Sequence, residues 1–88
     1  MMKTVLEEAS EVVADRHASY GHPYDNLSDV AKMWSGLFCV DISAEDVALA
    51  MILVKVCREK NMHKLDNLID IAGYTQCIQD IKDIRAGI

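Results

Sequence analysis

The sequence predicts an all-α domain, a compact antiparallel four-helix bundle that spans residues 1–88. Apolar residues recur at the three- and four-residue spacing of an amphipathic helix in four separate segments. The links between these segments are short and polar, and loops of roughly two to eight residues are typical of helical bundles. A chain of this length forms one small domain. The first helix is predicted over residues 3–17.

A break follows at residues 18–23, in the run Ala-Ser-Tyr-Gly-His-Pro. Gly21 permits a positive φ angle, and Pro23 suits the first turn of the next helix. The second helix is predicted over residues 24–38, and its apolar stripe includes Trp34.

The third helix has a capping-box start, in which Ser43 precedes Asp46 by three residues. Every residue from 47 to 57 except Lys55 is apolar. A helix that is apolar all round is buried, so this segment is predicted to be the central helix. After a polar connection, the fourth helix runs over residues 65–84.

Composition excludes several classes of protein. Fourteen acidic residues against nine basic ones give a net charge of −5, which argues against nucleic acid as the main partner. No uncharged apolar run is long enough to cross a membrane, and the N-terminal residues do not form a signal peptide. We therefore expect a cytoplasmic protein with neither a nucleic-acid nor a membrane partner.

The three cysteines, Cys39, Cys57 and Cys77, form no Cys-x-x-Cys pair. All three fall in apolar helical contexts, which predicts buried free thiols in a reducing compartment.

The most informative stretch runs from Asp66 to Tyr74. At about 100° per residue, Asp66, Asp70, Gly73, Tyr74 and Cys77 share one face of a helix. Two carboxylates one turn apart can share a cation, and a glycine at this position suggests close approach to the backbone. The structural alternative is a pair of solvated acids beside a glycine that lets another helix pack closely.

Lys55 is the single charge in an apolar run, and Arg58 lies one turn later on the same side. A lysine in such a run must extend to solvent, pair with an acid or meet a ligand. One interpretation is a buried ion pair of Lys55 with Asp70 or Asp66. The other is a phosphate site built from Lys55 and Arg58, and the two are compatible if the acids orient the bases in the empty state.

Arg16 and Tyr20 flank the break after the first helix. The guanidinium of Arg16 suits a phosphate or a carboxylate, but it could equally cap the helix and pair with a nearby acid. No catalytic residue is assigned. The predicted ligand-binding residues are Arg16, Tyr20, Lys55, Arg58, Asp66, Asp70 and Tyr74.

These residues stand in a spaced pattern: Arg-x-x-x-Tyr-Gly from Arg16, Lys-x-x-Arg from Lys55, and Asp-x-x-x-Asp-x-x-Gly-Tyr from Asp66. The pattern resembles a family of small, uncharacterised, all-helical proteins common in phage genomes. The resemblance implies a phage-type protein, in the cytoplasm of a bacterial host. Its role would be to bind a nucleotide-like phosphate ligand, for instance by sequestering a signalling nucleotide of host defence.

A more distant resemblance is to the MazG-like nucleotide pyrophosphohydrolases, which hold Mg²⁺ with a Glu-x-x-Glu motif and a Glu-x-x-Asp motif. Glu8 and Glu11 match the first motif, but Asp66 and Asp70 are four residues apart rather than three. In this interpretation Asp66, Asp70, Glu8 and Glu11 hold Mg²⁺ and the protein cleaves a nucleoside triphosphate. The nucleotide-binding interpretation requires no cofactor.

A third interpretation is a helical interaction module without a small ligand. Self-association is also predicted, because the third helix is apolar on every side and the second carries Trp34 and Phe38.

Overall fold

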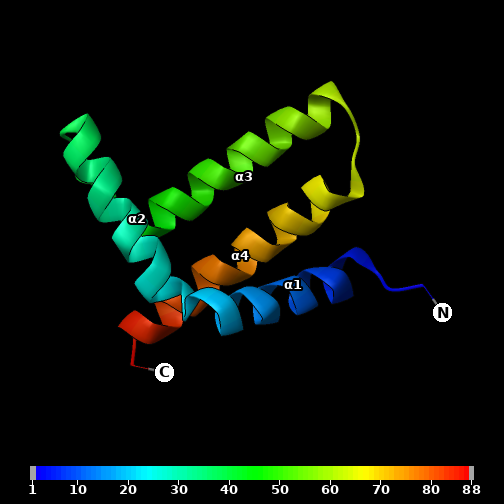
Figure 1. The fold of residues 1–88 in the computed structure, drawn as a ribbon, viewed down its shortest axis with the longest axis horizontal. Coiled ribbons are helices and arrows are strands. Elements are labelled where there is room, and N and C mark those ends of the chain that lie inside the picture. Colours follow the sequence, from blue (N-terminus) through cyan, green and yellow to red (C-terminus); the bar gives the residue numbers. More distant parts are fainter. Residues whose placement is uncertain (1, 88) are drawn as a thin grey trace.

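The computed structural model describes residues 2–87 and consists of four helices joined by short links (Figure 1). The prediction of an all-α, four-helix fold is confirmed. The helix bounds agree with the predicted ranges to within a few residues at each end. The helices are α1 (Val5–Tyr20), α2 (Pro23–Phe38), α3 (Ala44–Asn61) and α4 (Leu65–Arg85).

Two of the four helices begin with a capping box. The predicted box of α3 is present: Asp46 N donates to Ser43 Oγ at 3.1 Å, and Ser43 N donates to Asp46 Oδ2 at 3.0 Å. These two bonds to Ser43 lower the pKa of Asp46. Thr4 and Glu7 form the same arrangement at the start of α1, which the sequence analysis missed.

The break between α1 and α2 is only two residues long. Gly21 has φ 84°, so it adopts the positive φ predicted for it, and Pro23 occupies the first turn of α2. His22 lies between them, and its Nδ1 accepts a hydrogen bond from Tyr24 N at 2.9 Å. The chain therefore turns sharply, and α2 leaves at an angle to α1.

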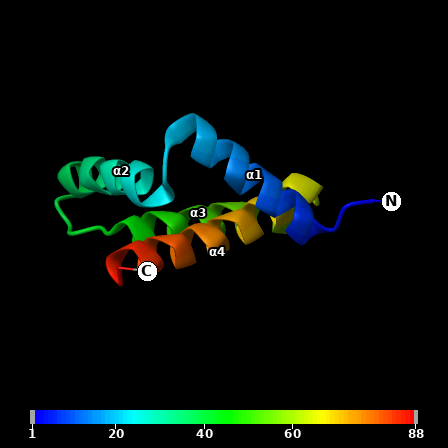
Figure 2. The same ribbon diagram turned by 90° about the horizontal axis from the view of Figure 1, so that it is seen from below.

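The central helix is α4, whereas the sequence analysis predicted the third helix. α4 contacts all three other helices, and α1 and α3 do not contact each other within residues 2–87. Figure 1 shows that α3 and α4 form an antiparallel hairpin, whereas α1 and α4 run in the same general direction. Figure 2 shows α1 and α2 on one side of that hairpin. The predicted antiparallel arrangement thus holds for α3 and α4 but not for α1 and α4.

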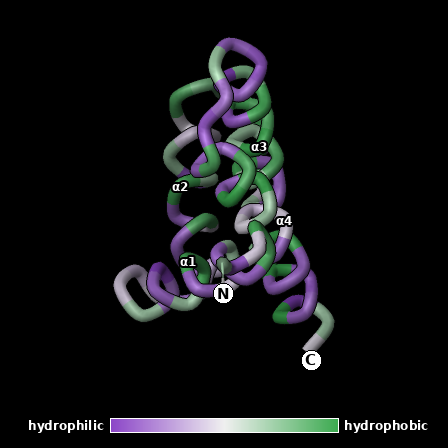
Figure 3. Tube along the Cα trace, turned by 90° about the vertical axis from the view of Figure 1, so that its right-hand side faces the viewer, coloured by the Kyte–Doolittle hydropathy of each residue, from purple (hydrophilic) through white to green (hydrophobic). Residues whose placement is uncertain are grey.

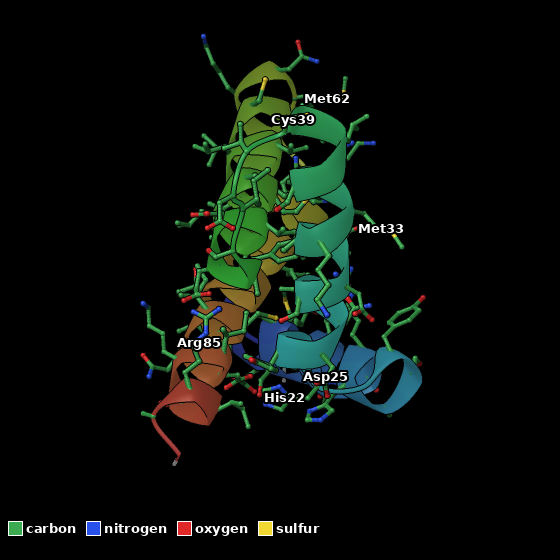
Figure 4. All side chains as sticks on the ribbon, turned by 90° about the vertical axis from the view of Figure 1, so that its left-hand side faces the viewer. His22, Asp25, Met33, Cys39, Met62 and Arg85 are labelled. Atoms are coloured by element: carbon green, nitrogen blue, oxygen red, sulfur yellow. The ribbon has the colours of Figure 1, made fainter. Side chains whose placement is uncertain are left out.

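The core lies where α2, α3 and α4 meet. Ala48 and Ile81 are completely buried there, and partly buried aromatic side chains such as Trp34 and Tyr74 pack around them. Arg85, which is labelled in Figure 4, connects α4 to the other two helices at this end of the molecule. It forms an ion pair with Glu45 of α3 and lies over the ring of Tyr24 of α2. The buried core residues are Leu27, Ala31, Ala44, Val47, Ala48 and Ile81.

The prediction that α3 is buried on every side is wrong. Leu49 is 51% exposed, Leu53 68% and Val56 48%. Only α2 and α4 cover this helix, because α1 packs against α4 instead. One side of α3 is therefore apolar and uncovered.

The connection between α3 and α4 is anchored by Glu59. Its Oε1 accepts hydrogen bonds from Lys64 N at 3.0 Å and from Asn67 Nδ2 at 3.2 Å, and its Oε2 pairs with His63. The bond to His63, followed by the bond to Lys64 N, lowers the pKa of Glu59. The link between the two helices is short, since α3 continues to Asn61 and α4 begins at Leu65.

The three cysteines are free, as predicted, but two of them are not buried. Cys39 and Cys57 are exposed, and Cys77 is partly buried. Cys39 ends α2 at a positive φ, and Cys57 lies on α3 beside its uncovered side. No helix within residues 2–87 combines the length and the hydropathy that a bilayer crossing needs.

Candidate functional site

The first cavity, called cavity A here, has a volume of about 240 Å³ and lies between α1, α2 and α4. Apolar and aromatic side chains make up most of its wall. Arg16 and Asp70 supply the charged groups at its edge. The lining residues are Val12, Val13, Arg16, His17, Tyr20, Gly21, Pro23, Asn26, Leu27, Asp70, Gly73, Tyr74 and Cys77.

The face of α4 predicted from the sequence forms one wall of this cavity. Asp70, Gly73, Tyr74 and Cys77 all line cavity A, so the shared-face prediction is confirmed for four of its five members. Asp66, one turn earlier, lines a different cavity.

Gly73 is buried where α1 approaches α4. A Cβ atom built on it would lie 3.5 Å from Val13 Cγ2, which is ordinary van der Waals contact. The crossing of α1 and α4 therefore does not itself require a glycine. A methyl group at this position would stand in the wall of cavity A.

Two further groups in cavity A bear on its chemistry. Burial, followed by the nearby carboxylate of Asp80, raises the pKa of the Cys77 thiol, so this side chain is a neutral part of the wall at pH 7. His17 stands edge-on to His22, with ring centroids 5.2 Å apart. Cavity A thus offers flat aromatic surfaces and few charges.

The second cavity, cavity B, has a volume of about 550 Å³ and lies between the end of α3 and the start of α4. Three cationic side chains face two carboxylates there, together with two asparagines. Arg58 is exposed, so its guanidinium is reachable from solvent. The lining residues are Lys55, Arg58, Asn61, Met62, Lys64, Asp66, Asn67 and Asp70.

Asp70 belongs to both cavities. Its Oδ2 lies 2.8 Å from Lys55 Nζ in cavity B, and its Oδ1 lies 3.6 Å from Arg16 Nη2 in cavity A. The side chains of Lys55 and Asp70 are only 15% and 14% exposed, whereas that of Arg16 is half exposed. Of the two acids considered for Lys55, Asp70 is therefore the one that pairs with it, and the acid near Arg16 is the same residue. Asp70 thus holds one cation of each cavity.

All seven predicted ligand-binding residues line one of the two cavities. Arg16, Tyr20 and Tyr74 line cavity A, and Lys55, Arg58 and Asp66 line cavity B, with Asp70 common to both. The polar side chains that the sequence analysis missed are His17, Asn26, Asn61, Lys64 and Asn67.

Among the missed residues, Asn67 is the most informative. It is 6% exposed, and it donates to Glu59 across the α3–α4 connection. Its position at the start of a helix is common for asparagine, so no sequence signal distinguished it from an ordinary surface residue.

The four predicted Mg²⁺ ligands do not come together. Asp66 and Asp70 line cavity B, but Glu8 and Glu11 line neither cavity, and Glu11 pairs with Lys3. Across residues 2–87, no three or more His, Cys, Asp or Glu side chains are grouped so that they could hold a metal ion. The residues present therefore do not fit the metal centre that the MazG-like resemblance implied.

Two curated proteins that are similar to this chain come from mycobacterial phages. The Gene 55 protein of Mycobacterium phage D29 is 40% identical over 83 residues, which cover 92% of this chain and 55% of that protein. The Gene 55 protein of Mycobacterium phage L5 is 32% identical over 82 residues, covering 90% of this chain and 53% of that protein. The chain spans about half the length of these curated relatives, and no solved structure matches it.

The expected resemblance to a phage-borne, uncharacterised family is thus confirmed. A family described as "Domain of unknown function (DUF6378)" matches residues 4–82, nearly the whole of the four-helix fold. The chain belongs to this family.

Proposed function

We propose that this protein binds a nucleotide-type ligand across cavities A and B. The observation that carries the proposal is the order in which chemical groups follow one another along the site. An apolar, aromatic cavity comes first, then the carboxylate of Asp70, then a cavity with three cations. A nucleotide has the same order of a flat ring, sugar hydroxyls and phosphates.

Each part of such a ligand has a chemically suitable partner. Tyr20 and Tyr74 offer ring faces on which a base could stack. Asp70 can accept hydrogen bonds from sugar hydroxyls, which a carboxylate does well. Lys55 and Arg58 can hold phosphate oxygens, with Arg58 as the accessible fork.

The ion pairs at Asp70 would hold two cations in position for a ligand. Lys55 already has its counter-charge, so its ammonium group is fixed at the edge of cavity B. Arg16 is half exposed and 3.6 Å from Asp70, so it can turn toward an incoming ligand at small cost. A phosphate bound in cavity B would then share Lys55 with Asp70, and Arg16 would meet the part of the ligand that lies in cavity A.

We propose sequestration rather than hydrolysis as the role, because the predicted Mg²⁺ ligands are not grouped. The phage origin of the similar proteins supports a role against a signalling nucleotide of the host. The hydrolytic alternative, a MazG-like pyrophosphohydrolase, would need Asp66 and Asp70 to act without Glu8 and Glu11.

The experiment is a thermal-shift screen of nucleoside triphosphates and cyclic dinucleotides, each with and without Mg²⁺. We expect at least one compound to raise the melting temperature without Mg²⁺ and to be recovered intact by chromatography. Stabilisation that needs Mg²⁺ and yields product would instead establish the hydrolytic alternative. No stabilisation by any compound would favour an interaction module without a small ligand.

A pair of variants links any hit to the site. Arg58→Gln should reduce the shift, because it removes an exposed cation of cavity B. Lys82→Gln is the matched control, since Lys82 is exposed on α4 and lines neither cavity.

A further inference from the structure

The uncovered side of α3 carries a regular apolar stripe. Leu49, Leu53 and Val56 are separated by four and three residues, the spacing of a coiled-coil seam. The same spacing continues outward to Asp46 at one end and Lys60 at the other. Figure 3 shows α3 hydrophobic along much of its length.

Neighbouring segments extend this apolar surface. Phe38 continues the stripe of α2 that packs into the core through Leu27 and Ala31, but it is 60% exposed. Figure 1 shows why: the end of α2 diverges from α3, so the two helices form a V that opens away from the core. Met33, by contrast, points away from α3 (Figure 4), and it is not part of the surface.

The exposed area is close to what a stable dimer needs. Five apolar side chains on this surface are each about half or more exposed, and at roughly 100 Å² each they offer about 500 Å². That lies within the range of the largest apolar patch on a typical monomer, and a standard interface buries about 800 Å² per partner, only part of it apolar. The five are Phe38, Val40, Leu49, Leu53 and Val56.

The charges at the ends of the stripe indicate which partner covers it. Asp46 and Lys60 each lie seven residues from Leu53, on opposite sides of it. When two copies of α3 pack antiparallel near Leu53, Asp46 of each copy comes beside Lys60 of the other. A two-fold interface must be complementary to itself in this way. Within residues 2–87 neither Asp46 nor Lys60 takes part in a salt bridge. Asp46 Oδ2 accepts the capping hydrogen bond from Ser43 N, and the carboxylate is exposed and still carries its charge toward a neighbouring Lys60.

We infer that the uncovered side of α3 is a homodimer interface, in which a second copy of this chain packs its own α3 antiparallel to the first. Asp46 and Lys60 set the direction, and the apolar stripe supplies the stability.

Light scattering on the full chain at micromolar concentration tests this inference. We expect a dimer, and we expect Leu53→Glu to weaken the dimer by roughly tenfold or more, because it buries a charge at the centre of the seam. Leu6→Glu is the matched control: Leu6 is 73% exposed on α1, outside the surface, and this variant should stay dimeric. Circular dichroism of both variants should show unchanged helix content.

A second variant tests the antiparallel direction. Lys60→Glu would put two carboxylates together at each end of the interface, so it should weaken the dimer, and added salt should restore it by screening. Lys82→Glu makes the same charge change on α4 and should have no effect. A monomeric wild-type chain, a dimer that survives Leu53→Glu, or a dimer indifferent to Lys60→Glu would overturn the inference. A monomer would also mean that another protein or chain segment covers α3.

Discussion

The two cavities that meet at Asp70 are built from different chemistry. Cavity A is walled by aliphatic and aromatic side chains from three helices, with a neutral thiol and a buried glycine. Cavity B is walled by lysines, an arginine, asparagines and carboxylates from the end of one helix and the start of the next.

This difference follows from the position of each cavity along the helices. Cavity A lies where α1 crosses α4 and the apolar stripe of α1 is partly buried. Its wall is therefore made of the same kind of apolar side chains that pack the two helices together. Cavity B lies near the turn of the hairpin, where α3 and α4 carry their polar ends. Asp70, largely buried on the central helix, therefore joins an apolar cavity to a charged one.

The largest change in stability is expected from Lys55→Met, which removes the cation that cavity B supplies to Asp70. The fold should lose up to about 3 kcal/mol of unfolding free energy, because a largely buried carboxylate loses its nearest partner. Arg16 remains close enough to limit the loss. Urea denaturation measures this.

The double variant Lys55→Met with Asp70→Asn separates structure from binding. It should recover much of the lost stability, since no unpaired carboxylate remains, yet it should still bind the nucleotide poorly. Full binding by either variant would show that cavity B does not hold the phosphates.

A smaller and opposite effect is expected from Gly73→Ala in cavity A. Alanine favours a helix interior by about 1 kcal/mol over glycine, and its Cβ would meet Val13 at an ordinary distance. The variant should therefore melt at a higher temperature. Its methyl group should also lower nucleotide affinity, because it enters cavity A. Unchanged affinity would show that the nucleotide base does not bind in cavity A.

Particular residues show how much of these regions the sequence predicted. Helical spacing identified four helices, and it placed Asp70, Gly73, Tyr74 and Cys77 on one face, because these depend only on local geometry. It also anticipated the pairing of Lys55 with an acid, since a charge inside an apolar run needs a partner.

The prediction of α3 as the central helix failed because periodicity reports how apolar a helix is, not what covers it. An uncovered apolar face and a buried core produce the same run of residues, as the exposed Leu49 and the buried Val47 show. The role of Asn67 and the division between cavities A and B depend on long-range packing, which spacing along the chain does not contain.

Arg58→Gln should leave stability almost unchanged, within about 0.5 kcal/mol, because Arg58 is exposed. Its effect should appear only in binding, as a weaker dependence of nucleotide affinity on salt concentration. Titrations at two salt concentrations measure this; an unaltered salt dependence would remove Arg58 from the phosphate site.

The smallest effect on the two cavities is expected from a change at Glu59, which lines neither of them but bonds Asn67 in the wall of cavity B. Its folded-state pKa is lowered, so its contribution to stability is present above its unfolded pKa of about 4.3 and is lost as the pH falls through the folded pKa. Glu59→Gln should destabilise the protein at pH 7 and make little difference in strong acid. Urea melts of both proteins over that pH range test this, and a constant difference would contradict it.

The most direct test of the central claim is calorimetric titration of the wild-type protein with a nucleoside triphosphate that stabilises it, with its nucleoside, and with inorganic triphosphate. If one ligand spans both cavities, the intact nucleotide should bind at least tenfold more tightly than either part, because the two halves are held together. Inorganic triphosphate binding as tightly as the nucleotide, or no binding of any of the three, would contradict the account.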